Sequence, residues 1–330
     1  MPFRPPFCPR ELCPSHAGAP FSYRERGYFY RRCDHRTVQR FLCLACRLSF
    51  SEQTFRLNYR LKRPELLALF FLDRVSKVSH RQSARIHPCS RSTEERHFRR
   101  LSLHCLAFHA LRLKEIVASG GRGEVFSLDE LETFEHNRRQ KPVTVPILIE
   151  HASGFVIDTR VGTLPARGRS KRKSALAVAQ GGEERKSESV EVVQAAFERL
   201  REVSLKDRQL TVLTDMKTSY ERILREMFGE RCVHRQVHSK LPRNPMSPLF
   251  AINHTLARVR DGLSRLVRRS WCAAKLRRWI AGHLAIWTCY RNYVLKRTNR
   301  VWETPAMALG TQTRFWPVDE VLLWRVFSWS

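Results

Sequence analysis

Apolar and polar positions along the middle of the chain predict strands that alternate with helices. Short apolar runs bounded by turn residues indicate β-strands, and apolar residues at helical spacing indicate helices packed on them. The first three strands are joined by short turns, which predicts antiparallel neighbours. The predicted strands are 125–134, 143–149, 155–164, 210–214 and 232–237, and the predicted helices are 190–200 and 218–228.

This order predicts an α/β fold with a ribonuclease-H-like core, in which three antiparallel strands precede parallel strands linked by helices. Such cores carry metal-binding carboxylates on the first and fourth strands, where this chain has Asp129 and Asp215. Taken singly, each aspartate fits a turn or cap, the more common use of Asp at a strand end. Together they predict a site for divalent metal, and Glu130 should point to the opposite face of the sheet because strand side chains alternate.

A third metal ligand is expected from the helix after the last strand. No glutamate occurs between Glu230 and Glu303, so the candidates are Asn253, through its amide oxygen, and Asp261, two helical turns further on. Position favours Asn253, and Asp261 stays an alternative.

The segment between 59 and 118 predicts three helices. Apolar residues at 66–71 mark the first, 79–86 fits a short second, and a capping box at Ser92–Glu95 predicts the start of a third. This pattern resembles a helix-turn-helix whose last helix binds the DNA major groove. The alternative is a helical bundle with a solvated basic face. The basic residues assigned to DNA on this third helix are Arg96, Arg99 and Arg100.

Two cysteine pairs near the start of the chain predict a zinc ribbon. Paired thiols on two knuckles can hold one tetrahedral Zn²⁺, with His16, Cys33 and His35 as possible substitute ligands. The remaining single cysteines fit buried core thiols better than ligands. The four predicted zinc ligands are Cys8, Cys13, Cys43 and Cys46.

Charge then identifies the class of partner. The 330 residues include 60 Lys and Arg against 31 Asp and Glu, so the formal net charge of +29 predicts binding to nucleic acid by counterion release. The basic loop 167–189 and an amphipathic basic stretch that starts at Arg265 support this, and Lys275 is placed near the scissile phosphate. No apolar run is long enough for a membrane span, so a soluble, cytoplasmic, nucleoid-associated protein is expected. Further arginines assigned to the DNA backbone are Arg268 and Arg269.

Together these residues resemble the transposases of bacterial insertion sequences of the Asp-Asp-Glu or Asp-Asp-Asn kind, in the branch with an N-terminal zinc ribbon and helix-turn-helix. The resemblance rests on the motifs 43–50, 128–134, 213–217 and 253–269. It implies a Mg²⁺- or Mn²⁺-dependent enzyme that binds terminal inverted repeats, cleaves a DNA strand and joins its 3′-hydroxyl to target double-stranded DNA. It further implies a homo-oligomeric synaptic complex.

The expected domains are a zinc ribbon over 1–58, a helix-turn-helix domain over 59–118, a catalytic domain over 119–300 and a tail over 301–330. One alternative function is a non-catalytic DNA-binding protein derived from an inactivated transposase. Another is a structure-selective nuclease such as a Holliday-junction resolvase, which shares the core but does not need two N-terminal DNA-binding modules.

Overall fold

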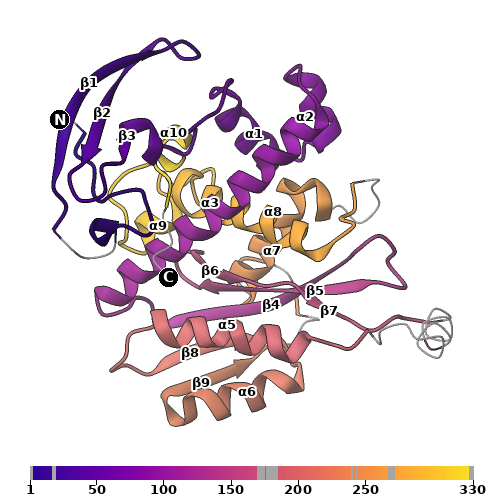
Figure 1. The fold of residues 1–330 in the computed structure, drawn as a ribbon. Coiled ribbons are helices and arrows are strands. Elements are labelled where there is room, and N and C mark those ends of the chain that lie inside the picture. The colour runs from indigo at the N-terminus through magenta and orange to yellow at the C-terminus, as the bar shows by residue number, and fades with distance from the viewer. Residues whose placement is uncertain are drawn as a thin grey trace. The chain divides into compact units, whose positions relative to one another are not determined.

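The computed structural model describes residues 3–16, 20–168, 175, 185–238, 241–242, 244–266 and 272–326 (Figure 1). The chain forms two compact units, Met1–Phe70 with Pro317–Ser330, and Phe71–Trp316. These units differ from the four domains expected from the sequence, because the division falls within a helix and the chain's end joins the first unit. Most of the predicted basic loop 167–189 lies outside the described residues, as do Arg268 and Arg269.

The first unit is built on a small antiparallel sheet of order β1-β2-β3. Phe41 and Phe50 stack in its core at 5.6 Å between ring centroids, and Phe55 closes the cluster. The end of the chain completes this unit, since Trp324 stacks on Phe3 at 5.2 Å. The elements are η1 (Pro14–His16), β1 (Tyr23–Arg31), β2 (Arg36–Cys43), β3 (Ser49–Ser51), η2 (Glu52–Phe55) and α10 (Val318–Val321).

The second unit contains a mixed sheet of order β6-β5-β4-β8-β9, with β7 paired to β5. β4, β5 and β6 pair antiparallel, whereas β8 lies parallel to β4 and β9 parallel to β8. The predicted mixed α/β fold is therefore confirmed. The strands are β4 (Val125–Phe134), β5 (Pro142–Glu150), β6 (Val156–Thr159), β7 (Gly162–Thr163), β8 (Leu210–Thr214) and β9 (Cys232–Gln236).

Helices cover both faces of this sheet, and every residue of β5 is buried as a result. α5 packs on β5 and β6 through apolar positions that include Val193, Phe197 and Leu200, and α7 contacts β4 and β5 from the other side (Figure 1). No helix in the described ranges has the length and apolar character needed to cross a membrane. The helices here are α5 (Ser189–Val203), α6 (Thr218–Phe228), η3 (Gly229–Arg231), α7 (Phe250–Gly262), η4 (Ser264–Leu266), α8 (Arg277–Cys289), η5 (Tyr290–Val294) and α9 (Pro305–Ala308).

The three helices predicted before the sheet are present as α1 (Leu66–Val75), α2 (His80–Ile86) and α3 (Arg91–Ala118). The capping box predicted at Ser92 is wrong: Ser90 caps α3 by accepting from the Thr93 N–H at 3.1 Å. α3 lies along α8, and a Cβ at Gly282 would come within 2.6 Å of the Ser102 hydroxyl. The close approach therefore needs glycine, and α3 is a core element of the second unit.

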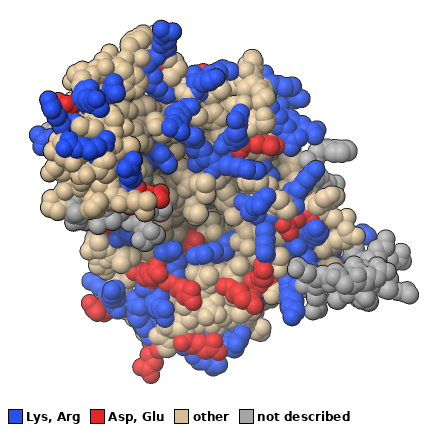
Figure 2. Space-filling model, in the orientation of Figure 1, with Lys and Arg blue, Asp and Glu red and all other residues tan. Residues whose placement is uncertain are grey.

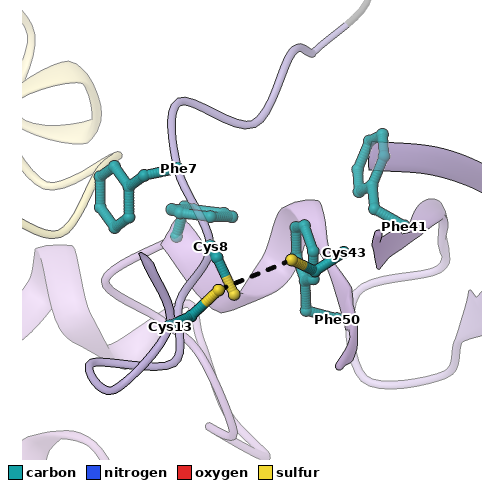
Figure 3. Packing of buried hydrophobic residues seen from close by; sticks show 7 residues of the cluster. Phe7, Cys8, Cys13, Phe41, Cys43 and Phe50 are labelled. Atoms are coloured by element: carbon teal, nitrogen blue, oxygen red, sulfur yellow. Dashed lines mark hydrogen bonds between the residues drawn. The ribbon is translucent and has the colours of Figure 1, made fainter. Parts of the chain in front are cut away.

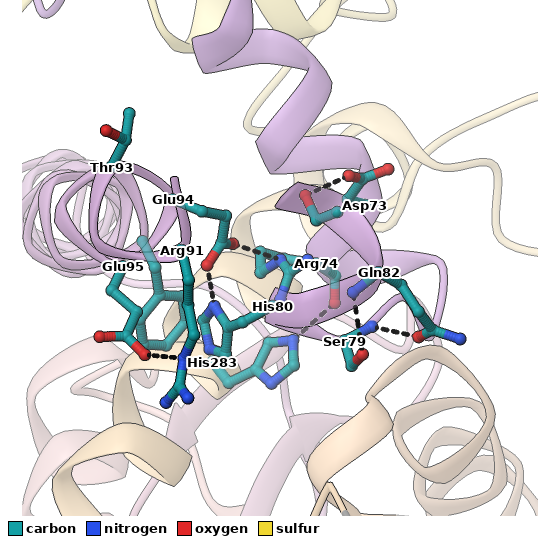
Figure 4. A network of polar contacts seen from close by, with 12 residues as sticks. Asp73, Arg74, Ser79, His80, Gln82, Arg91, Thr93, Glu94, Glu95 and His283 are labelled. Atoms are coloured by element: carbon teal, nitrogen blue, oxygen red, sulfur yellow. Dashed lines mark hydrogen bonds and ion pairs between the residues drawn. The ribbon is translucent and has the colours of Figure 1, made fainter. Parts of the chain in front are cut away.

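A buried ionic cluster joins these helices (Figure 4). The Arg74 guanidinium lies 3.4 Å from the Glu94 carboxylate, and both side chains are 0% exposed. His80 also contacts Glu94, and the ring of His283 donates to the Arg74 carbonyl at 2.6 Å. Glu94, which lies within the predicted capping box, is the counter-ion of a buried arginine, because a buried charge needs a partner.

Candidate functional site

Asp129 lies on β4, and Asp215 directly follows the neighbouring parallel strand β8. The two strands pair from Val125 with Thr211 to Ser127 with Leu213. Continued two residues past the last of these pairs, the same register would bring Asp129 opposite Asp215. Neighbouring strands are about 4.8 Å apart, and residues paired in register point to the same face. Both carboxylates are half-buried and can approach a shared cation.

The electrostatics around Tyr220 support this proximity. Tyr220 is buried on α6, and its pKa is raised first by burial and then by the charges of Glu130, Asp215 and Asp129. Carboxylates from β4 and from the turn after β8 therefore act on one phenol. Glu130 is neutralised by Lys217, which leaves Asp129 and Asp215 as the two charges that a divalent cation would neutralise.

Glu130 faces the opposite side of the sheet from Asp129, as strand alternation predicts. It accepts a hydrogen bond from the Ser189 hydroxyl at 2.8 Å and pairs with the Lys217 ammonium, which also donates to Ser189 at 2.6 Å. The backbone N–H of Lys217 donates to the Asp215 carboxylate at 3.2 Å. Lys217 therefore holds the turn after β8 and limits the motion of Asp215.

Sequence reasoning missed Lys217. The signal that was present is an aspartate at a strand end followed two residues later by a backbone donor, the pattern of an Asx turn. The partners of the lysine side chain, Glu130 and Ser189, come from distant positions in the sequence, and only the fold brings them together.

The two candidates for a third ligand lie at opposite ends of α7. Asn253 is half-buried in the first part of the helix, and its side-chain amide has no hydrogen-bond partner among the residues described. Asp261 is 86% exposed and pairs with Lys77 at 3.3 Å. Eight residues of helix separate them by about 12 Å. Because α7 contacts β4 and β5, Asn253 is the candidate with a free oxygen donor on the helix beside the sheet.

The four predicted zinc ligands converge in the first unit, and Figure 3 shows three of them, Cys8, Cys13 and Cys43. All four sulfur atoms lie within 4.8 Å of one another, with Cys8 and Cys46 at 3.5 Å and Cys13 and Cys43 at 3.8 Å. Tetrahedral Zn²⁺ with bonds of about 2.3 Å requires sulfur–sulfur distances near 3.8 Å. In the described part of the chain this is the only group of three or more His, Cys, Asp or Glu side chains arranged to hold a metal ion.

The residues considered as substitute ligands have other partners. Nδ1 of His16 bonds to the Cys8 carbonyl at 2.7 Å, and His35 bonds to the Tyr30 hydroxyl at 2.7 Å. Cys33 is exposed and contacts the Leu61 carbonyl at 3.6 Å. The geometry therefore favours the four cysteines as the complete ligand set.

The predicted DNA-binding arginines divide into exposed and buried groups. Arg96 and Arg99 are exposed on α3, where the Arg99 guanidinium lies 4.9 Å from the centre of the Trp279 ring, and Arg100 is half-buried. Arg265 differs: it contacts His80 inside the second unit and stacks over Phe98 at 5.2 Å.

Burial lowers the pKa of Arg265 to about 10. A guanidinium enclosed in this way supports the packing of its own unit and is not presented to a phosphate.

Lys275 is exposed, but it lies in a non-helical segment before α8 rather than on the predicted amphipathic helix. Its neighbours bond to the end of β4: the Arg277 N–H donates to Glu135, and the His136 N–H donates to the Ala274 carbonyl at 2.8 Å. Six strand residues, about 20 Å, separate that end from Asp129. The predicted role at the scissile phosphate has no geometric support in this arrangement.

Charge is unevenly distributed on the visible surface of the second unit. Many of the acidic side chains in view gather over the region of α5 and α6, whereas Lys and Arg dominate most of the remaining face (Figure 2). Phosphate backbones are attracted to the basic part of such a surface.

Comparisons with known proteins give only distant likenesses. No family model matches the sequence, and no curated protein matches it. The structure is similar to a strand transfer complex of Mos1 at 13% identity and a TM-score of 0.25, over 69% of this chain and 76% of that chain. It is also similar to the catalytic domain of Mos1 mariner transposase, at 15% identity and a TM-score of 0.23, over 58% of this chain and 91% of that chain. A Mos1 transposase paired-end complex with the left transposon end has 12% identity and a TM-score of 0.26, over 67% of this chain and 73% of that chain. TM-scores this low do not establish a shared fold.

Proposed function

We propose that this chain is a metal-dependent DNA transposase with a ribonuclease-H-like catalytic core. The observation that supports it best is the parallel pairing of β4 with β8, whose register, continued by two residues, would bring Asp129 opposite Asp215. The surrounding order, with β5 and β6 antiparallel on one side of β4 and β8 and with β9 parallel on the other, is the one expected of such cores.

The substrate follows from charge. A net charge of +29 favours binding to a phosphate polymer. Asp129 and Asp215 are negative charges within this basic protein. Carboxylates repel an anionic substrate, so a site that contains both needs metal cations between them. When bound, Mg²⁺ or Mn²⁺ would supply an activated oxygen nucleophile and stabilise the leaving oxygen at a phosphodiester.

The protein's own residues would position that chemistry. Asp129 and Asp215 would ligate the metal, with the Asn253 amide oxygen as third donor, and Lys217 would keep Asp215 oriented through its backbone N–H. Hard oxygen ligands of this kind suit Mg²⁺. Terminal inverted repeats as the DNA ends, and a homo-oligomeric synaptic complex that joins two of them, belong to the same proposal.

The four-cysteine cluster would hold Zn²⁺ as a structural ion. Four thiolates in a closed tetrahedral set leave no open position for a substrate, which is the pattern of structural zinc sites. The ion would tie the segment around Cys8 to the knuckle around Cys43 and so fix the base of the β1–β2 hairpin.

A second candidate function is a DNA-binding protein without catalytic activity. One observation favours it: the third ligand position has an amide instead of a carboxylate, and no third acidic group joins Asp129 and Asp215 within the described ranges. Loss of a carboxylate ligand weakens the hold on a divalent ion.

Nicking and strand transfer on the DNA that flanks the reading frame, with Mg²⁺ or Mn²⁺, distinguish these functions. We expect cleavage by the parent protein, loss of cleavage in Asp215→Asn, and retained cleavage in Glu132→Gln, a matched control on the opposite face of β4. Specific binding without cleavage in any variant would support the non-catalytic alternative. Cleavage of branched DNA without sequence preference would support a junction-resolving nuclease.

A further inference from the structure

The hairpin formed by β1 and β2 displays three consecutive aromatic residues to solvent. Tyr28 is 64% exposed, Phe29 37% and Tyr30 57%. Large aromatic side chains are usually buried unless they serve a contact, because exposing them forgoes about 1.5 to 3 kcal/mol each. Their grouping on one strand is therefore the most unusual surface feature of the first unit.

The two faces of this hairpin differ. Phe29 pairs across the ladder with Val38, which is 1% exposed, and Arg31 donates to the carbonyls of Asn58 and Leu61 at 3.2 and 3.1 Å. That inner face is thus held against the body of the first unit. Because side chains alternate along a strand, Tyr28 and Tyr30 share the opposite, outer face.

The outer face is completed by polar residues and a bulge. Tyr28 lies opposite Gln39, and Tyr30 lies opposite Thr37. The register shifts between Glu25 and Tyr28, and Gly27 there has a φ of +69°, which a glycine adopts without strain. A bulge of this kind twists a strand and changes the direction of its side chains.

Four exposed arginines lie along the same hairpin as the aromatic pair, and strand alternation puts Arg24 and Arg40 on the face of Val38. Glu25 is the only exposed acidic residue of the hairpin, and these four arginines have no ion-pair partner in the described part of the chain. Figure 2 shows blue side chains clustered at the upper left, where Figure 1 places β1 and β2. The exposed arginines are Arg24, Arg26, Arg32 and Arg40.

The spacing of the two tyrosines matches a base. Residues two apart on one strand face are separated by about 7 Å, which is twice the rise of about 3.4 Å between stacked bases. One base can therefore lie between the rings of Tyr28 and Tyr30. The bond from the Tyr30 hydroxyl to His35, 2.7 Å long, keeps one of these rings in place.

We propose that the outer face of the β1–β2 hairpin is a stacking platform for unpaired DNA bases, with the neighbouring arginines on the phosphates. Bases within a duplex already stack on each other, whereas an unpaired strand offers free faces to aromatic rings. The proposal rests on DNA as the partner of the proposed function, but not on its metal chemistry, so the failure of one does not imply failure of the other.

The test compares binding of the full chain to a mixed-sequence single-stranded DNA with binding to the same strand carrying abasic sites, by fluorescence anisotropy without divalent metal. Removing the bases keeps the phosphates and isolates stacking. We expect Tyr28→Ser with Tyr30→Ser to weaken binding to the intact strand roughly 5- to 100-fold, the loss of stacking of about one base. Binding to the abasic strand should barely change.

Two further variants make the result specific. Tyr28→Phe with Tyr30→Phe keeps both rings and should keep the affinity. Leu12→Ser, which removes another highly exposed apolar side chain of the first unit, should leave both affinities unchanged.

Unaltered affinity in the double serine variant would overturn the proposal, and so would an equal loss on intact and abasic strands. Zinc content and melting temperature, measured on each variant, show whether the first unit is still folded. If the serine variant does not fold, the test is the parent protein's affinity for the intact strand compared with its affinity for the abasic strand. Equal affinities for the two strands would also overturn the proposal.

Discussion

Replacing one of the paired aspartates by asparagine should stabilise the protein without metal and abolish its stabilisation by metal. If the register of β4 and β8 continues to Asp129 and Asp215, their charges lie about 5 Å apart, the spacing of neighbouring strands. Like charges at that distance repel by about 3 kcal/mol at an effective dielectric constant near 20 and by about 1 kcal/mol in water. Both side chains are half-buried, so the expected gain for Asp215→Asn in EDTA is about 1 to 3 kcal/mol.

The asparagine should preserve the local structure. Asp215 accepts from the Lys217 N–H at 3.2 Å, and the amide oxygen of an asparagine can accept the same bond. The effect of the substitution is thereby confined to charge.

A bound divalent ion stabilises the parent protein relative to the asparagine variant. An ion that binds only the folded state stabilises it by about 1.4 kcal/mol at ten times its dissociation constant. The parent protein should therefore unfold at a higher temperature in Mg²⁺ or Mn²⁺ than in EDTA, and Asp129→Asn and Asp215→Asn should lose this difference.

The assay is thermal or urea unfolding of each variant across a metal titration. Glu132→Gln is the matched control, because its carboxylate is on the same strand but pairs with Arg167 at 2.7 Å on an exposed surface. It should keep the metal response. A parent protein indifferent to Mg²⁺ and Mn²⁺, or an Asp215→Asn variant that is less stable than the parent in EDTA, would refute the reasoning.

Three other perturbations have defined outcomes. Cys43→Ser should lower the zinc content from one atom per chain to near zero and reduce the melting temperature of the first unit, and full zinc content by atomic absorption would contradict this site. Glu94→Gln leaves Arg74 without a counter-ion and should cost about 3 to 5 kcal/mol in urea unfolding, against less than about 1 kcal/mol for Glu95→Gln on the surface; equal costs would disprove the buried pair. Burial holds the pKa of His283 well below its usual value, so only the unfolded chain protonates it, and stability should fall by about 1.4 kcal/mol between pH 7 and 5.5; a His283→Asn variant with the same pH slope would argue against this origin.

Local pattern was sufficient for several elements of the second unit, although the strand predicted over 155–164 is divided into β6 and β7. Strands β4 and β8 and helix α6 have the bounds that apolar periodicity predicted, because each depends on residues close in sequence. The four-cysteine set was likewise predicted from spacing, since knuckle geometry is local. The start of α3 was not predicted correctly, because Ser90 and Ser92 are equally good caps by residue type and the structure uses Ser90.

The aromatic hairpin shows a different limit. The run Tyr28–Tyr30 is apolar in composition, and composition does not tell a core strand from an exposed one. Its exposure follows from the bulge at Gly27 and from pairing with β2, which are properties of the folded sheet.

The sequence by itself determined the identity and order of the strands and helices, the two aspartates, the four thiols and the excess of positive charge. Tertiary structure decided which of these groups meet: the parallel pairing of β4 with β8 brings the segments of Asp129 and Asp215 together, and helix packing encloses Arg265 while leaving Arg99 exposed. The physical reason is that periodicity records which face of an element is buried, whereas the partner of that face is selected by contacts between residues distant in the chain.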